Sequence, residues 1–518
     1  MLMQIRRPMA MLILLSFIGC VRIPSLTEEE KQTLPQHYIL VDRDGFALDR
    51  KGNALSTEGL QQDLTDTILA GLKTRAKQLH EENEQSKCQI LTDCPPMRVL
   101  VFVHGGMNGY KADFKRIRGL VERDPGEMKP AILHAAHSTY YPIFINWNSD
   151  LPDSIKDDLF FIRAGEREAD WYTALTWPFL LIGRLAGSVA SLPVSMGHTG
   201  RNIKEGFKGA IEQGDSKACA VADVIAHSPL FLINAATTPL LEGFGRPGWH
   251  IMKRRAELSI ASRLEKNDHR SMEGAVRTLI KTIRQPILQL TVDHQIAVEI
   301  TLVGHSMGSL ILNRLLAVLE QQGGLIPIQH IIYLAPAASI EELDEMVFPF
   351  LVSHRETKFW LFTLNRRDEA REIPQPLAIL LPRGSLLAWI DTFLEPVGAV
   401  GDKTLGSIRN VNNYYQPEPL PFTPQREVFR ERTINWNHNA AGQIRVFETV
   451  RDLNQKNRIE EHSDFSAPRF LGQVLCKIDH EAFKNKLCEN ELNQFYPQYD
   501  PEKDRQTRIC GARVWPWP

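Results

Sequence analysis

The residues whose types and spacing could do chemistry stand in "ITLVGHSMGSLIL" (Ile300–Leu312), where Ser306 lies between Gly304 and Gly308. Residues 298–303, just before Gly304, are rich in β-branched side chains, which favours a short buried strand. The apolar residues that follow recur at helical spacing. A strand that turns directly into a helix strains the residue at its apex, and the flanking glycines leave room for neighbouring backbone. The pattern predicts a nucleophile elbow with Ser306 as the nucleophile; the alternative is a chance match in a loop.

A second segment, "VLVFVHGGMNGY" (Val99–Tyr110), reads as a buried strand that ends in the run HGG. Glycines leave backbone N–H groups unobstructed, which is what an oxyanion hole needs. The N–H of Gly106 or Met107 is therefore the expected second donor beside the N–H of Met307, at the first turn of the predicted helix. We expect His104 to brace this loop rather than to react. The alternative is an ordinary glycine turn.

A catalytic serine needs a base, and the base needs an acid to orient it. In "KFWLFTLNRRDEAREI" a predicted strand ends near Asn365, and Asp368 follows at once. The carboxylate of Asp368 is the predicted acid, while Glu369 and Asp391 are the other carboxylates near that position. The alternative for Asp368 is a solvated loop carboxylate.

The chain order serine, acid, histidine requires the base near the C-terminus, where His438, His462 and His480 are available. The strand-like "QIRVF" (443–447) is followed by "EEHSDF" and then by a helical stretch from Ala467. His462 therefore lies between the last strand and the last helix and is the predicted base. The alternative is an ordinary loop histidine.

The elements that must position these residues are short apolar runs: "RVLVFV", "PIFINW", "VEITLV", "HIIYLA" and "KFWLFTL". Most are continuous rather than alternating, which is typical of parallel strands covered by helices on both faces. The class expected is α/β with a mostly parallel central sheet, whose strands place function at their C-terminal ends. Upstream, turn signals in 38–55 predict a small hairpin, and leucine spacing in 59–84 predicts an amphipathic helix.

Roughly 140 residues separate "FINWNSD" from the nucleophile strand, which is too long for a plain crossover and predicts inserted structure. Two apolar segments, 174–196 and 228–244, favour a helical cap with an apolar inner face. Contact with a membrane surface is a compatible alternative. A transmembrane span is a third, although Arg184, Pro178 and Pro193 argue against it.

The N-terminus, "MLMQIRRPMAMLILLSFIGC", has the positive and apolar regions of a signal peptide, and its apolar part is too short to span a bilayer. The last four residues, 17–20, resemble a bacterial lipobox. That resemblance implies lipidation of Cys20, with an ordinary signal peptide or an uncleaved anchor as alternatives. Val21 differs from the aspartate that retains such lipoproteins in the inner membrane, so the outer membrane is expected.

Composition supports export and excludes some classes. Lys+Arg (60) and Asp+Glu (62) nearly balance, so no electrostatic footprint for nucleic acid stands out. Besides Cys20 there are six cysteines, and no C-x-x-C pair, so a zinc ribbon is not expected. In an oxidising periplasm Cys88 and Cys94 could close a small loop, and Cys476, Cys488 and Cys510 cluster near the C-terminus.

Together, "VFVHGG", "GHSMG", "RRDEA" and "EHSDF" resemble the α/β-hydrolase superfamily, and more loosely its exported bacterial lipase- and esterase-like members. The resemblance covers roughly 98–146 and 298–477. It implies a capped α/β-hydrolase fold and a Ser306–His462–Asp368 serine hydrolase, for which no metal or organic cofactor is expected. It does not fix the substrate, because this fold hosts many chemistries; the apolar insertion and the membrane anchor are what favour lipid-like or acyl esters. A thioesterase, acyltransferase, peptidase or non-catalytic scaffold are the alternatives. The expected parts are a signal peptide (1–20), a tether with an N-terminal helical segment (21–97), the first hydrolase part (98–150), the cap (151–295), the second hydrolase part (296–478) and a Cys-containing tail (479–518).

Overall fold

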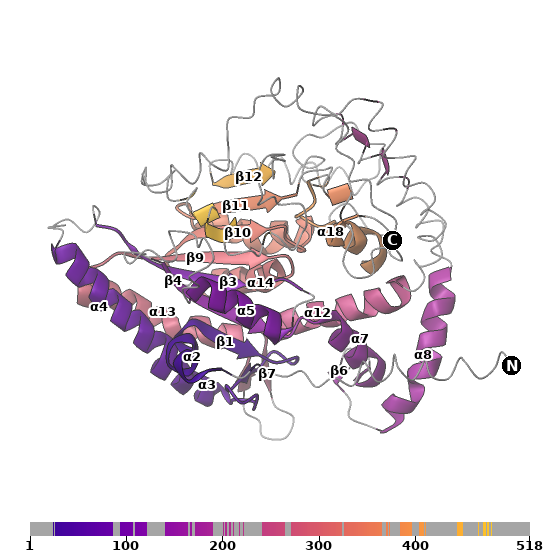
Figure 1. The fold of residues 1–518 in the computed structure, drawn as a ribbon, viewed down its shortest axis with the longest axis horizontal. Helices are drawn as coiled ribbons and strands as arrows, with labels where there is room; N and C mark the ends of the chain where they lie inside the picture. Colours follow the sequence, from indigo (N-terminus) through magenta and orange to yellow (C-terminus); the bar gives the residue numbers. More distant parts are fainter. Residues whose placement is uncertain are drawn as a thin grey trace. The chain divides into compact units, whose positions relative to one another are not determined.

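The fold is that of a computed structural model (Figure 1). The structure describes residues 24, 26–85, 94–106, 109–121, 140–163, 166–167, 171–189, 241–264, 271–323, 326–364, 369–370, 372, 384–395, 403–408, 410 and 443–448, together with runs of one to three residues between 200 and 221 and between 465 and 478. The chain divides into two compact units. Unit 1 comprises Met1–Gly126, Ala136–Gly183 and Phe244–Ile331, and unit 2 comprises Glu127–Ala135, Arg184–Gly243 and Ile332–Pro518.

The central element is an eight-stranded, mostly parallel sheet, which confirms the predicted α/β class. Its strand order is β12-β11-β10-β9-β3-β4-β1-β2. The pairs β1/β4, β3/β4, β3/β9 and β11/β12 are parallel, and β1/β2 is antiparallel. All five predicted apolar runs form strands to within one residue, as does "QIRVF". The strands are β1 (Tyr38–Val41), β2 (Ala47–Leu48), β3 (Met97–Val103), β4 (Tyr140–Trp147), β9 (Val298–His305), β10 (Ile328–Leu334), β11 (Lys358–Thr363) and β12 (Ile444–Glu448).

Strands β3, β4 and β9 form the centre of unit 1. Every residue of β3 is buried, as continuous apolar runs in parallel sheets require. In the register, Val103 lies opposite Gly304 on one side and Ile145 on the other. The C-terminal ends of the three strands therefore meet at one edge of the sheet, and the predicted elbow and glycine loop both start there.

The predictions for residues 38–84 of unit 1 are confirmed. Strands β1 and β2 form the expected hairpin, with Leu40 opposite Leu48. The predicted helix 59–84 is present as α3 (Thr57–Leu64), a π-helical turn η2 (Thr65–Leu69) and α4 (Ala70–Gln85). Its five predicted apolar positions are all buried: Leu60, Leu64, Ile68, Leu72 and Leu79.

The remaining helices of unit 1 pack beside these elements. Helix α13 (Ala275–His294) packs on α3 and α4, and α12 (Arg246–Leu258) packs on α7 (Leu151–Phe160) and α14 (Gly308–Gln321). In Figure 1, α4 and α13 run alongside each other. The unit also contains α2 (Glu28–Thr33), η1 (Leu34–His37), α5 (Tyr110–Val121) and the small hairpins β5 (Ile162–Arg163)/β6 (Glu166–Arg167) and β7 (Ser262–Leu264)/β8 (Ser271–Glu273).

The predicted insertion, 151–295, is split between the units. Its two ends, which carry α7, α12 and α13, belong to unit 1, while 184–243 belongs to unit 2. The first predicted apolar segment, 174–196, lies in part in the helix α8 (Trp171–Val189). The end of the second, 228–244, lies in η3 (Leu241–Gly245), which directly precedes α12. Within the described ranges, no helix has the length and apolar character needed to cross a bilayer.

Unit 2 contains β11, β12 and the end of β10, with short helical segments between them. Stacked aromatic rings join the two parallel strands, with Phe362 and Phe447 centroids 5.0 Å apart. Among its described residues, 470–472, 474–475 and 478 are helical, as predicted for the stretch after His462. The helical segments are α15 (Ile340–Glu342), η4 (Leu343–Val347), α16 (Phe348–Ser353), α18 (Leu386–Trp389) and η5 (Ile390–Leu394).

Candidate active site

The strand-turn-helix around Ser306 is present as predicted. Strand β9 ends at His305 and α14 begins at Gly308, so only two residues connect them. Ser306 has a φ of 50°, a left-handed conformation that costs a non-glycine residue energy. The backbone N–H of Ser309 donates to the Ser306 carbonyl at 3.2 Å, which closes the turn. The apex serine is therefore held in the strained conformation expected of a nucleophile elbow.

The glycines of the motif are needed for close backbone packing. A Cβ on Gly308 would overlap the Val103 carbonyl oxygen and lie 2.9 Å from the His104 carbonyl oxygen. A Cβ on Gly304 would lie 3.0 Å from the backbone nitrogen of Ser309. Strand β3 thus approaches the start of α14 more closely than any side chain at position 308 would permit.

Ser306 itself is buried, with 1% of its surface exposed. Its hydroxyl has no hydrogen-bond partner in the part of the chain that the structure describes. Ser309, the second residue of α14, instead donates its hydroxyl to the Ser306 carbonyl at 2.6 Å. A buried hydroxyl normally has a hydrogen-bond partner, so this oxygen stands out among the described residues.

The predicted glycine loop lies directly against the elbow. A Cβ on Gly105 would lie 2.8 Å from the Ser306 Cβ, and one on Gly106 would overlap the Met307 sulfur. Met307 precedes the first residue of α14, where the helix dipole makes the N–H groups attractive to an anion. Unit 1 therefore brings together Ser306, Gly106 and Met307, while Met107 lies outside the described residues.

His104 braces this loop, as expected. Its Nδ1 lies 2.7 Å from the Gly105 carbonyl oxygen, which fixes a proton on Nδ1 because a carbonyl can only accept. Its Nε2 accepts from the backbone N–H of Trp147 at 3.1 Å and also lies beside the carboxylate of Asp113. The indole N–H of Trp147 donates to the His104 carbonyl at 3.0 Å, so this buried aromatic supports the loop.

Ser149 is a residue of this site that the sequence argument missed. Its hydroxyl donates to the Gly105 carbonyl at 2.9 Å, although 44 positions separate the two residues. The one available signal was its place just after β4, whose C-terminal end adjoins that of β3.

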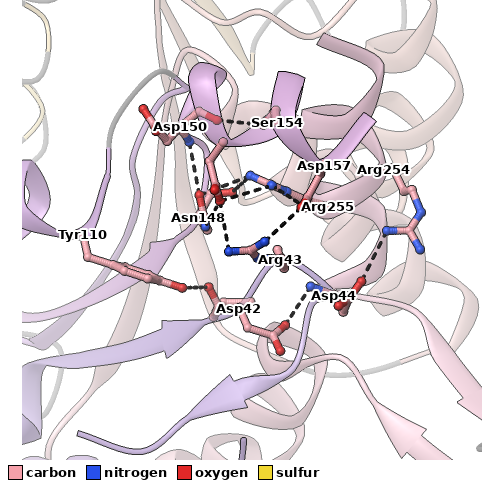
Figure 2. A network of polar contacts seen from close by, with 12 residues as sticks. Asp42, Arg43, Asp44, Tyr110, Asn148, Asp150, Ser154, Asp157, Arg254 and Arg255 are labelled. Atoms are coloured by element: carbon pink, nitrogen blue, oxygen red, sulfur yellow. Dashed lines mark hydrogen bonds and ion pairs between the residues drawn. The ribbon is translucent and has the colours of Figure 1, made fainter. Parts of the chain in front are cut away.

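A buried ionic cluster anchors the segment that carries Ser149 (Figure 2). Arg255 donates to the Asn148 carbonyl at 3.0 Å and to the Asp157 carboxylate at 2.8 Å. Arg43 reaches the same carboxylate at 2.9 Å, so two guanidinium groups and the carboxylates of Asp153 and Asp157 neutralise one another. Burial and the neighbouring Asp153 raise the pKa of Asp150, at the start of α7. A cleft of about 1440 Å³ borders this cluster and is lined by none of the predicted site residues.

Asp368, His462 and the lipidation site Cys20 lie outside the described residues, so the predicted acid and base remain predictions. Of the other two carboxylates, Asp391 has both oxygens engaged in unit 2, by the Thr404 N–H at 2.7 Å and the Asn410 amide at 2.8 Å. This arrangement indicates a structural role for Asp391. Glu369 is 1% exposed and accepts from the Ser385 hydroxyl at 3.4 Å.

Nothing among the described residues suggests a metal centre, because no three His, Cys, Asp or Glu side chains gather closely enough to hold an ion. Cys94 is in a disulfide, and the other six cysteines lie outside the described residues. Comparison of the chain with protein-family models, curated proteins and solved structures found no match to any of them.

Proposed function

We propose that the protein is a serine hydrolase with an α/β-hydrolase fold. The observation that carries the proposal is the left-handed, buried Ser306 between β9 and α14, directly beside the glycine loop that ends β3. A scaffold has no need for a strained serine at a strand-to-helix turn, whereas a nucleophile does. The sheet, the elbow and the loop after β3 also match the arrangement that this fold uses for acyl transfer.

In the proposed reaction, the Ser306 oxygen attacks the carbonyl carbon of an ester while His462 takes the serine's proton. The N–H groups of Met307 and of Gly106, or of Met107 in its place, bind the negative oxygen of the tetrahedral intermediate. The intermediate collapses, the alcohol leaves with the proton from His462, and an acyl group stays on Ser306. Asp368 holds the imidazole tautomer, and water, deprotonated by His462, then releases the acid.

We further propose that the substrate is a lipid-like or acyl ester and that the protein faces the periplasm, anchored to the outer membrane by a lipid on Cys20. Two observations support this setting. Cys94 is in a disulfide, which is typical of oxidising compartments. Helix α8 exposes Phe179 (78%) and Ile182 (65%), large apolar side chains that suit a cap or a lipid surface.

A thioesterase, acyltransferase or peptidase would use the same residues, so the experiment must identify the substrate as well as the mechanism. We would measure hydrolysis of a panel of acyl esters, thioesters and peptides by the full-length protein in detergent. Ser306→Ala, His462→Gln and Asp368→Asn test the three roles, with Glu369→Gln as the matched carboxylate control. Ester turnover lost in the first three variants and kept in the last is expected; turnover by Ser306→Ala would contradict the proposal.

A further inference from the structure

The Gly105 carbonyl and the Gly106 N–H belong to one peptide unit. In a trans peptide these two groups point in opposite directions, and rotation of one turns the other. Whatever fixes the direction of the Gly105 carbonyl therefore also fixes where the Gly106 N–H points.

Two buried donors hold that carbonyl. The Ser149 hydroxyl donates to it at 2.9 Å and the His104 Nδ1–H donates at 2.7 Å. A carbonyl oxygen has two lone pairs, so these two bonds use its accepting capacity fully. Ser149 is 0% and His104 2% exposed, which leaves both bonds shielded from competing water.

The same peptide unit lies against the elbow. A Cβ on Gly105 would approach the Ser306 Cβ to 2.8 Å, and one on Gly106 would overlap the Met307 side chain. A small rotation of this peptide would therefore change the direction of the Gly106 N–H right beside the reacting serine.

Asn148, the residue before Ser149, is fixed by contacts with distant segments of the chain. The Asn148 N–H donates to the Val41 carbonyl at 3.2 Å, which extends the β1/β4 pairing past the end of β4. The Asn148 carbonyl and side-chain oxygens accept from Arg255 at 3.0 and 3.1 Å. The hydroxyl of Ser149 thus comes from a rigid segment, as a group that orients a catalytic loop should.

We propose that Ser149 is a positioning residue: by binding the Gly105 carbonyl from outside the site, it aims the Gly106 N–H at the oxyanion. This inference rests on the proposed serine-hydrolase function. Loss of a complete oxyanion donor lowers kcat by about 10²–10³-fold. Because His104 would still hold the carbonyl in a Ser149 variant, a loss on the order of tenfold is expected.

The test compares Ser149→Ala with Ser154→Ala in the full-length protein. Ser154 is an ideal control because it is also 0% exposed and donates to a backbone carbonyl, that of Asp150, at 2.8 Å, but it does not contact the glycine loop. Active sites are counted by fluorophosphonate titration, and kcat and KM are measured for one acyl ester. Thermal unfolding of each variant is recorded in parallel.

The expected result for Ser149→Ala is a fall in kcat per active site with KM unchanged. Ser154→Ala should keep the wild-type kcat, and the two variants should have similar Tm values. Ser149→Thr, which restores a hydroxyl, should recover kcat. Equal kcat for the two alanine variants would overturn the inference while leaving the proposed function intact. A folded wild-type protein that neither labels nor turns over an ester would instead refute the proposed function, and this inference with it.

Discussion

If Ser306 is kept for catalysis at the expense of stability, its replacement by alanine should stabilise the protein. The Ser306 hydroxyl is buried and, within the described residues, unbonded. A buried hydroxyl without a partner costs about 1–3 kcal/mol in proteins. We therefore expect Ser306→Ala to raise the free energy of unfolding by about 1 kcal/mol, the lower end of that range. Ser306→Gly should add a few tenths more, because relief of about 1–2 kcal/mol of left-handed strain exceeds the entropy cost of glycine.

Ser309→Ala is the matched control. Ser309 is equally buried in the same turn, but its hydroxyl is bonded to the Ser306 carbonyl, so its loss should lower the free energy of unfolding by about 1 kcal/mol. Thermal unfolding followed by tryptophan fluorescence would place Ser306→Ala above the wild type and Ser309→Ala below it, each by on the order of 2 °C. If Ser306→Ala unfolds below the wild type, as Ser309→Ala does, the idea that Ser306 is kept at the expense of stability is wrong.

Three further perturbations test the surroundings of the site. Gly308→Ala should unfold the protein well below the wild-type Tm, because its Cβ meets backbone of β3 that cannot move aside. Arg255→Met should cost about 3–5 kcal/mol, because two buried carboxylates would then share the single guanidinium group of Arg43. Arg254→Met is the control: its ion pair spans 3.5 Å and is partly exposed, so its loss should cost less than about 1 kcal/mol, a difference that chemical unfolding would measure. Burial lowers the pKa of His37 below 6.5, so the stability that its neutral form contributes is complete above that pH and is lost as the pH falls. His37→Gln should therefore lose less stability than the wild type when thermal unfolding is followed from pH 7 to pH 5. An equal loss in both proteins would contradict this.

The sequence predicted those features that depend on local patterns. The apolar runs form strands because a parallel sheet is covered on both faces, so both faces of each strand require apolar side chains. The elbow was recognisable because strand, glycines, serine and helix follow one another without a gap. The role of His104 was also predictable, since the ring adjoins the loop that it braces.

Features that depend on contacts between distant segments were not predictable in this way. Ser149 stands in "NWNSD", where nothing nearby distinguishes it from a turn residue, and its partner Gly105 lies 44 positions away. Arg255 stands in the charged run "KRRAEL", which reads as a solvated helix face, yet its side chain is fully buried among carboxylates from α7. The π-helical turn at 65–69 was not predictable for a different reason: the leucine spacing continues through it unchanged.

The most direct test of the central claim is fluorophosphonate labelling of the full-length protein in detergent, followed by mass mapping of the adduct. An activated serine attacks the phosphorus, displaces fluoride and keeps the phosphonyl group, whereas an ordinary serine does not react. The account predicts a single adduct on Ser306, absent from Ser306→Ala and retained in Ser309→Ala. A folded wild-type protein that stays unlabelled, or is labelled at another residue, would contradict it.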